Sequence, residues 1–283
     1  MGLAKTSRAV LCLSQGRGSL GVGDTQDAIS HFLQGLTFVS VGSTGYLLKR
    51  GLVEAYREVE ERAKAIEVLE DIARTALHDE TYPSPLRRAY RFSTDAVTVT
   101  AARLEALEEI ADLHGEAGAH DEQAEALARL ADAAQATDLR LRARALREKA
   151  DVEGGAGNLR QALVTIEQAL EEARARSNAL DRAEALLIRA EVARNLGDRE
   201  TAHTALTEAL DDFTKAADAS GQARTEDRLG LLAYWGGDFE AAHRHFAALL
   251  AHARSAGSDS LERLAVKRIG QAEDQLSRPD ETP

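Results

Sequence analysis

The sequence predicts an all-α protein, a solenoid of stacked helical hairpins, and three observations lead to this fold class. Proline is absent from residues 86–278, which is typical of helices and not of a loop-rich β protein. A glycine followed five residues later by an alanine recurs along the chain, with a large apolar residue one helical turn further on. The composition, 44% apolar and 29% charged residues in a chain of 283, suffices to bury a core.

The recurring pattern indicates two helices joined by a tight turn. In its clearest copy, Leu229-Gly230 belongs to the first helix, Gly237-Asp238 forms the turn, and Ala242 and Phe246 belong to the second helix. The alanines of the other copies are Ala28, Ala65, Ala162 and Ala202. A small alanine lets two helix axes approach, and glycine permits the positive φ at which the first helix ends. One hairpin cannot bury its apolar stripe alone, so successive hairpins are expected to stack.

On these residues the sequence resembles the tetratricopeptide repeat family over roughly residues 8–255. The resemblance implies a right-handed α-α superhelix of about six hairpins. Their approximate bounds are 8–40, 44–78, 97–136, 139–176, 179–217 and 219–256. The spacing of 40 residues between Ala162, Ala202 and Ala242 resembles the long repeats attached to bacterial signal-transduction NTPases and transcription activators. One departure from the motif is Glu60, which replaces the turn glycine of the second unit.

Three segments depart from the repeat pattern. The glycine-rich stretch at residues 16–23 predicts a poor first helix that frays. Residues 79–96 contain two prolines and are expected to form a connector with an extended start. The capping-box pattern Asp259-Ser-Leu-Glu262 predicts a final helix over 259–277 that closes the stack.

Charge and cysteine content narrow the possible function classes. The 35 basic and 47 acidic residues give a net charge of −12, which disfavours direct binding to nucleic acid or to an anionic membrane. The single cysteine, Cys12, allows no internal disulfide, so we expect a cytoplasmic protein. No run of residues approaches the ~20 apolar residues of a membrane-spanning helix.

No sequence pattern indicates catalysis, a cofactor or a metal. Gly16-Arg-Gly18-Ser-Leu-Gly21 matches a dinucleotide-binding loop, but no acidic residue follows between Ala28 and Val53 to hold a ribose. No two of the eight histidines stand four residues apart, the spacing that a helix-borne metal pair prefers. Cys12 has no identifiable base partner. We therefore expect a protein that is not an enzyme and needs no cofactor or metal.

The remaining candidate site is the concave groove that tetratricopeptide arrays form along the first helix of each unit. The resemblance places these candidate residues in it: Arg50, Arg57, Arg144, Arg147, Arg194, Asn195, Arg224, Tyr234 and Trp235. Because arginine binds carboxylates in a bidentate manner, we expect a partner protein or peptide with acidic or C-terminal carboxylate groups. Two alternatives stay open. Arg144 and Arg147 can pair with acids such as Glu148, and Tyr234 and Trp235 can pack against the C-terminal helix.

Two functions fit these expectations. The first is a protein–protein interaction scaffold that holds a partner segment in its groove through preorganised polar and aromatic side chains. The second is a signal-sensing regulatory module of a bacterial transcription or signal-transduction system, in which an inducer or partner shifts an equilibrium between states. The sequence contains no P-loop and no clear helix-turn-helix motif, so in the second role other chains would supply ATP hydrolysis or DNA contact.

Overall fold

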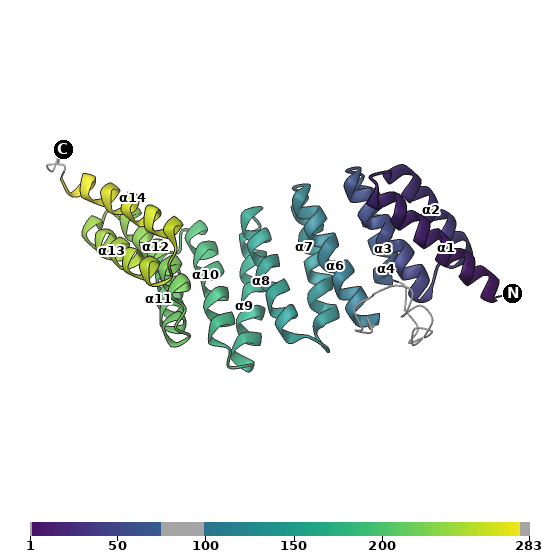
Figure 1. Cartoon of the computed structure of the whole chain (residues 1–283). Helices are drawn as coiled ribbons and strands as arrows, with labels where there is room; N and C mark the ends of the chain where they lie inside the picture. The colour runs from purple at the N-terminus through teal and green to yellow at the C-terminus, as the bar shows by residue number, and fades with distance from the viewer. Residues whose placement is uncertain (1, 75–98, 278–283) are drawn as a thin grey trace. The chain divides into compact units, whose positions relative to one another are not determined.

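The computed structural model describes residues 2–74 and 99–277, which form thirteen helices and no strand (Figure 1). The helices are α1 (Gly2–Gly21), α2 (Thr25–Phe38), α3 (Gly42–Glu58), α4 (Arg62–Arg74), α6 (Val99–Glu116), α7 (His120–Ala134), α8 (Leu139–Gly155), α9 (Leu159–Ala175), α10 (Ala179–Asn195), α11 (Arg199–Lys215), α12 (Ala219–Trp235), α13 (Phe239–Ser255) and α14 (Asp259–Leu276). The predicted connector at residues 79–96 lies outside the described residues.

The chain divides into two compact units, Met1–Asp138 and Leu139–Pro283. In the first unit α1 packs on α2, α3 on α4 and α6 on α7, while α2–α3 and α4–α6 contacts join successive hairpins. In the second unit α8–α9, α10–α11 and α12–α13 form the hairpins, and α14 packs on α13. Within each unit, therefore, helices bury their apolar faces mainly against neighbours in the sequence, as helical repeats do.

The turns show why glycine recurs at a fixed place in the sequence. Gly237 has φ 81°, and its N–H donates to the carbonyl of Tyr234 at 3.0 Å. The next N–H, of Asp238, donates to the carbonyl of Ala233 at 3.0 Å, which completes a Schellman motif at the end of α12. Asp238 is also the N-cap of α13, because its carboxylate accepts the N–H of Ala241 at 2.8 Å. One short turn thus ends one helix and starts the next.

Three residues other than glycine adopt the left-handed conformation at such turns in the described part of the chain. Glu60 has φ 58°, at the position where the sequence predicts that it replaces glycine. Ser177 and Ala217, in turns between hairpins, have φ 53° and 54°. The backbone geometry is therefore imposed by helix packing even where the side chain disfavours it.

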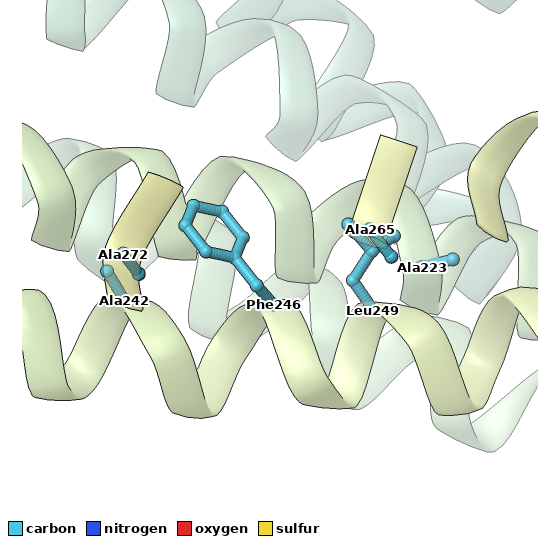
Figure 2. Packing of buried hydrophobic residues seen from close by; sticks show 6 residues of the cluster. All are labelled: Ala223, Ala242, Phe246, Leu249, Ala265 and Ala272. Carbon is cyan, nitrogen blue, oxygen red and sulfur yellow. The ribbon is translucent and has the colours of Figure 1, made fainter. Parts of the chain in front are cut away.

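The repeated alanines lie at the close contacts that the sequence predicts. Ala28, Ala65, Ala162, Ala202 and Ala242 are all buried, with at most 1% of their surface exposed. Figure 2 shows one such cluster, in which the Phe246 ring lies between the alanine pair Ala242–Ala272 and the group around Leu249. Gly230, on α12, lies so near this ring that an added Cβ would stand 2.4 Å from it. Small residues therefore make room for the aromatic ring between the helices.

The first helix does not fray, contrary to the prediction from its glycines. The helix α1 continues through Gly16 and Gly18 to Gly21. Gly16 faces the ring of Phe32 on α2, and a Cβ at this position would stand 2.5 Å from a ring carbon. The packing of α1 against α2 thus uses the glycine that lowers its intrinsic helix propensity.

The last helix is present as predicted, but its capping residue differs. The N-cap is Ser258 and not Asp259, and the Ser258 hydroxyl accepts the N–H of Leu261 at 3.5 Å. Gly257, with φ 64°, ends α13 and positions the very next residue as the cap. Glu262 instead forms an ion pair with Arg254 at 3.5 Å.

Candidate binding surface

The nine candidate residues all lie on the first helix of a hairpin. Arg50 and Arg57 are on α3 of the first unit. In the second unit the candidates lie on α8 (Arg144, Arg147), α10 (Arg194, Asn195) and α12 (Arg224, Tyr234, Trp235). We call the side of the second unit formed by α8, α10 and α12 its first-helix face.

In the first unit, the two candidate arginines join α3 to α6. Arg50 donates to both carboxylate oxygens of Glu109, at 2.7 and 2.8 Å. These hydrogen bonds raise the pKa of Arg50 above its ordinary value, against the opposing effect of burial. Arg57 lies 3.5 Å from Glu116, which follows Glu109 by about two turns of α6. Both arginines therefore hold two first helices together.

A cavity of about 590 Å³ adjoins these pairs and is lined by residues of α1 and α3 together with Glu109. Its charged lining includes Arg50, Arg57, Glu54 and Glu58, so acids and bases alternate along its wall. Arg50 is already paired with Glu109 of this lining, and Arg57 is paired with Glu116. This cavity therefore offers a mixed surface without a dominant charge.

In the second unit, two arginines make the same kind of link between successive first helices. Arg147 on α8 donates to Asp181 on α10 at 2.8 Å. Arg224 on α12 donates to both oxygens of Glu184 on α10, at 2.5 and 3.3 Å. Hydrogen bonding to Glu184 raises the pKa of Arg224. These bonds use both arginines for helix-to-helix pairing.

The link between α12 and α14 completes this series in the second unit. Arg268 donates to Asp227 at 3.0 Å. Arg144 differs, because it is exposed and its charged neighbour on the same helix, Glu148, lies 3.8 Å away. The alternative of surface pairing is thus realised for Arg144 with Glu148, whereas Arg147 pairs across helices.

The two aromatic candidates point to different surroundings. Tyr234 packs edge-on against Phe239, with ring centroids 5.3 Å apart, and contacts the buried cluster that α13 and α14 share. Trp235 is 56% exposed, and the guanidinium of Arg194 lies 5.1 Å from the centre of its ring. Packing toward the C-terminal helix therefore describes Tyr234 but not Trp235.

A second cavity, of about 270 Å³, lies between α10, α11 and α12 and brings Arg194 and Trp235 together. Its lining residues are Ala190, Glu191, Arg194, Ala202, Leu206, Asp227, Arg228, Leu231, Leu232 and Trp235. We call it the α10–α12 cavity. Asn195, although adjacent to Arg194 in the sequence, is exposed and does not belong to the lining.

Arg228 is the arginine of this cavity that the sequence pattern does not single out. It follows Arg224 by four residues, so the two share one face of α12, and this spacing was the available signal. The sequence does not reveal which arginine is paired. Arg224 reaches Glu184, whereas half-buried Arg228 makes no ion pair or hydrogen bond through its side chain to any residue of 2–74 or 99–277.

Two further features concern the described part of the chain. Nowhere in it do three or more histidine, cysteine, aspartate or glutamate side chains gather in a way that could hold a metal ion. None of its helices has the length and apolar character needed to cross a membrane.

Helical hairpins in series, each closed by a Schellman turn and packed through small residues, define a helical-repeat protein. No protein-family model and no curated protein matches the sequence. Among solved structures, a protein from Pyrococcus horikoshii is similar, with a TM-score of 0.60 and 14% identity over 98% of this chain and 39% of that one. It is described as a signal transduction ATPase with numerous domains and a tetratricopeptide repeat sensor.

Two other solved structures are similar along most of their own length. Aspartyl phosphate phosphatase F from Bacillus subtilis gives a TM-score of 0.52 and 14% identity, over 98% of this chain and 72% of that one. BtubC (BKLC) from P. vanneervenii gives 0.50 and 18%, over 82% and 94%. At these identities the likeness concerns the fold. The chain has the all-α superhelical fold of tetratricopeptide repeat proteins, as the sequence predicts.

Proposed function

We propose that this chain is a non-catalytic interaction scaffold that binds a segment of a partner protein on the first-helix face of its second unit. The observation that carries the proposal is the position of Trp235, which is 56% exposed and stacked beneath Arg194. Tryptophan and arginine supply much of the binding energy at protein interfaces. Covering the exposed ring would also remove apolar surface from water, which favours association.

The partner segment is expected to carry carboxylates. Arg228 and Arg194 border the same cavity as Trp235, and guanidinium groups recognise carboxylates through paired hydrogen bonds. In this proposal the paired arginines, such as Arg147 and Arg224, keep the first helices in register so that the contacting side chains are preorganised. Arg144 and Asn195, both exposed, are expected to add outer contacts. The buried free thiol of Cys12 agrees with a cytoplasmic location.

The test uses the intact chain as an affinity bait in lysate of the source cells, with Trp235→Ala as the test variant. Val266→Ala is the matched control, because Val266 is another exposed apolar residue of the second unit, at 60%. We expect mass spectrometry to find proteins that the parent and Val266→Ala retain and that Trp235→Ala loses. Identical proteins in all three captures would contradict the assigned surface.

The second candidate function, a signal-sensing regulatory module, is supported by the α10–α12 cavity, which is large enough to admit a small effector. The structural similarity to a protein described as having a tetratricopeptide repeat sensor agrees with this role. A thermal-shift screen separates the two functions. Stabilisation by a metabolite favours sensing, and stabilisation by a protein or peptide alone favours the scaffold.

A further inference from the structure

The walls of the α10–α12 cavity are mostly apolar. Ala190 from α10, Ala202 and Leu206 from α11, and Leu231 from α12 line it, and Trp235 stands at the same wall as Leu231. At about 270 Å³ the cavity lies just below the range of ~300–1,000 Å³ that is typical of ligand pockets, so it suits only a compact ligand. Such walls favour an apolar body of modest size, because burying it removes apolar surface from water.

The lining carries two acids and two arginines, but one of the acids is paired with Arg268, which lies outside the lining. Glu191 forms its ion pair with Arg194, and Asp227 is engaged by Arg268 at 3.0 Å. Arg228 remains, half-buried and without a carboxylate partner in the described parts of the chain. The two acids of the lining are thus neutralised by other arginines, and one positive charge is left over at the cavity. A half-buried cation without a counter-charge is electrostatically unfavourable, and an anion would compensate it.

We propose that the α10–α12 cavity binds a small organic monoanion, a carboxylate with a compact apolar or aromatic body, whose charge pairs with Arg228. The apolar body packs on the leucine and alanine walls and against the ring of Trp235. A dianion such as phosphate fits less well, because the lining has a single unpaired arginine and also contains the acids Glu191 and Asp227. This inference goes beyond the proposed scaffold role, since it requires no protein partner.

The structure also supplies the reporter for a test. Trp235 is the only tryptophan of the chain, so tryptophan emission reports on a side chain that lines this cavity. The probes are phenylacetate, 3-phenylpropionate and hexanoate, each titrated into the full chain. Phenylacetamide is the matched neutral probe, since it keeps the apolar body and lacks the charge. Arg228→Gln is the test variant, and Arg244→Gln, an exposed arginine of α13 outside the cavity lining, is its control.

We expect at least one of the three carboxylates to change Trp235 emission saturably. Phenylacetamide should bind the parent chain about tenfold or more weakly than phenylacetate does, which corresponds to about 1.4 kcal/mol. Arg228→Gln should bind the carboxylate about tenfold or more weakly than the parent chain. Arg244→Gln should bind as the parent does. Absence of a saturable change with all three acids would overturn the proposal, as would equal binding of phenylacetate and phenylacetamide. Unchanged affinity in Arg228→Gln would also overturn it. The acid–amide comparison uses the parent chain and so does not depend on how a variant folds. The titration contains only the chain and the probe. A negative result would therefore overturn the small-ligand proposal and leave the scaffold proposal unaffected, because the affinity capture tests that one separately.

Discussion

At the scale of single residues, the pair between Arg182 on α10 and Asp212 on α11 contains the most deeply buried charged side chain among the described residues of the second unit, that of Asp212. The Asp212 carboxylate is fully buried and accepts two hydrogen bonds from the Arg182 guanidinium. Removing Arg182 would leave this carboxylate buried without compensation, and we expect Arg182→Ala to lower the free energy of unfolding by about 3–5 kcal/mol. Urea denaturation followed by circular dichroism measures the loss.

The neighbouring pair supplies the matched control for this prediction. Asp211 and Lys215 lie on the same helix as Asp212, but their side chains are 61% and 59% exposed. Because water screens such a pair, Lys215→Ala should cost less than about 1 kcal/mol. Losses of similar size in Lys215→Ala and Arg182→Ala would show that burial of Asp212 does not set the energy of the contact.

Two carboxylates of the first unit predict opposite dependences of stability on pH. The Arg129 hydrogen bonds lower the pKa of Glu70, so its stabilising effect is complete above the unfolded-state pKa and is lost as the pH falls through the folded-state value. Burial, with nearby Glu108 and Glu116, raises the pKa of Asp112, so its ionisation destabilises the fold above that raised value. Glu70→Gln should therefore destabilise the protein at neutral pH, and Asp112→Asn should stabilise it.

Unfolding free energies measured from neutral to acidic pH test both signs. Each difference from the parent chain should shrink as the pH falls below both pKa values of the group concerned, because the carboxyl is then protonated in both states. A pH-independent difference for either variant would mean that loss of shape, and not of charge, causes the effect.

The sequence predicts which residue types line the first helices but not how they pair. Arg50 and Glu109 stand 59 residues apart, and Arg224 and Glu184 stand 40 apart. Such contacts depend on how one hairpin is rotated on the next, which helical periodicity does not specify. For the same reason the sequence names Arg224 as a candidate residue without showing that it pairs with Glu184, and does not single out Arg228, which is unpaired in the described part of the chain.

At the scale of helices and turns, the sequence was most informative where one local rule decides the geometry. The glycine–alanine spacing located the turns because a left-handed residue must end the first helix before the second can pack back on it. The prediction that α1 frays was wrong, because helix propensity takes no account of the contact between Gly16 and Phe32. Local propensity weighs less than packing at such a contact.

Two turns of the second unit test the preference for glycine at left-handed positions, and the two substitutions are expected to change stability in opposite directions. Ala217 and Gly237 occupy equivalent left-handed positions, with φ 54° and 81°. An alanine there is strained by about 1 kcal/mol relative to glycine, since its Cβ crowds the backbone. Ala217→Gly should therefore raise the free energy of unfolding by about that amount, and Gly237→Ala should lower it. Denaturant midpoints that move in the same direction would contradict this assignment.

At the scale of the whole molecule, the packing connects helices that follow one another in the sequence within each unit. A local defect is therefore expected to spread through neighbouring helices and to weaken with distance along the chain, as in other repeat proteins. The composition and the repeat spacing predict this architecture well, because every unit obeys the same packing rule. Composition and repeat spacing do not predict a ligand, because the ligand depends on the few side chains in which the hairpins differ from one another.

Phe246 allows this whole-molecule behaviour to be measured. Its ring is fully buried among α12, α13 and α14, so Phe246→Ala should cost about 3–5 kcal/mol through the cavity it leaves (Figure 2). We expect hydrogen exchange followed by mass spectrometry to show lost protection in these three helices, while α1–α4 of the other unit keep theirs. Trp235→Ala, at an exposed ring, should change neither region. Equal loss of protection in both units would instead mean that the chain unfolds as one cooperative body, and that stability is shared more widely than the packing of successive helices implies.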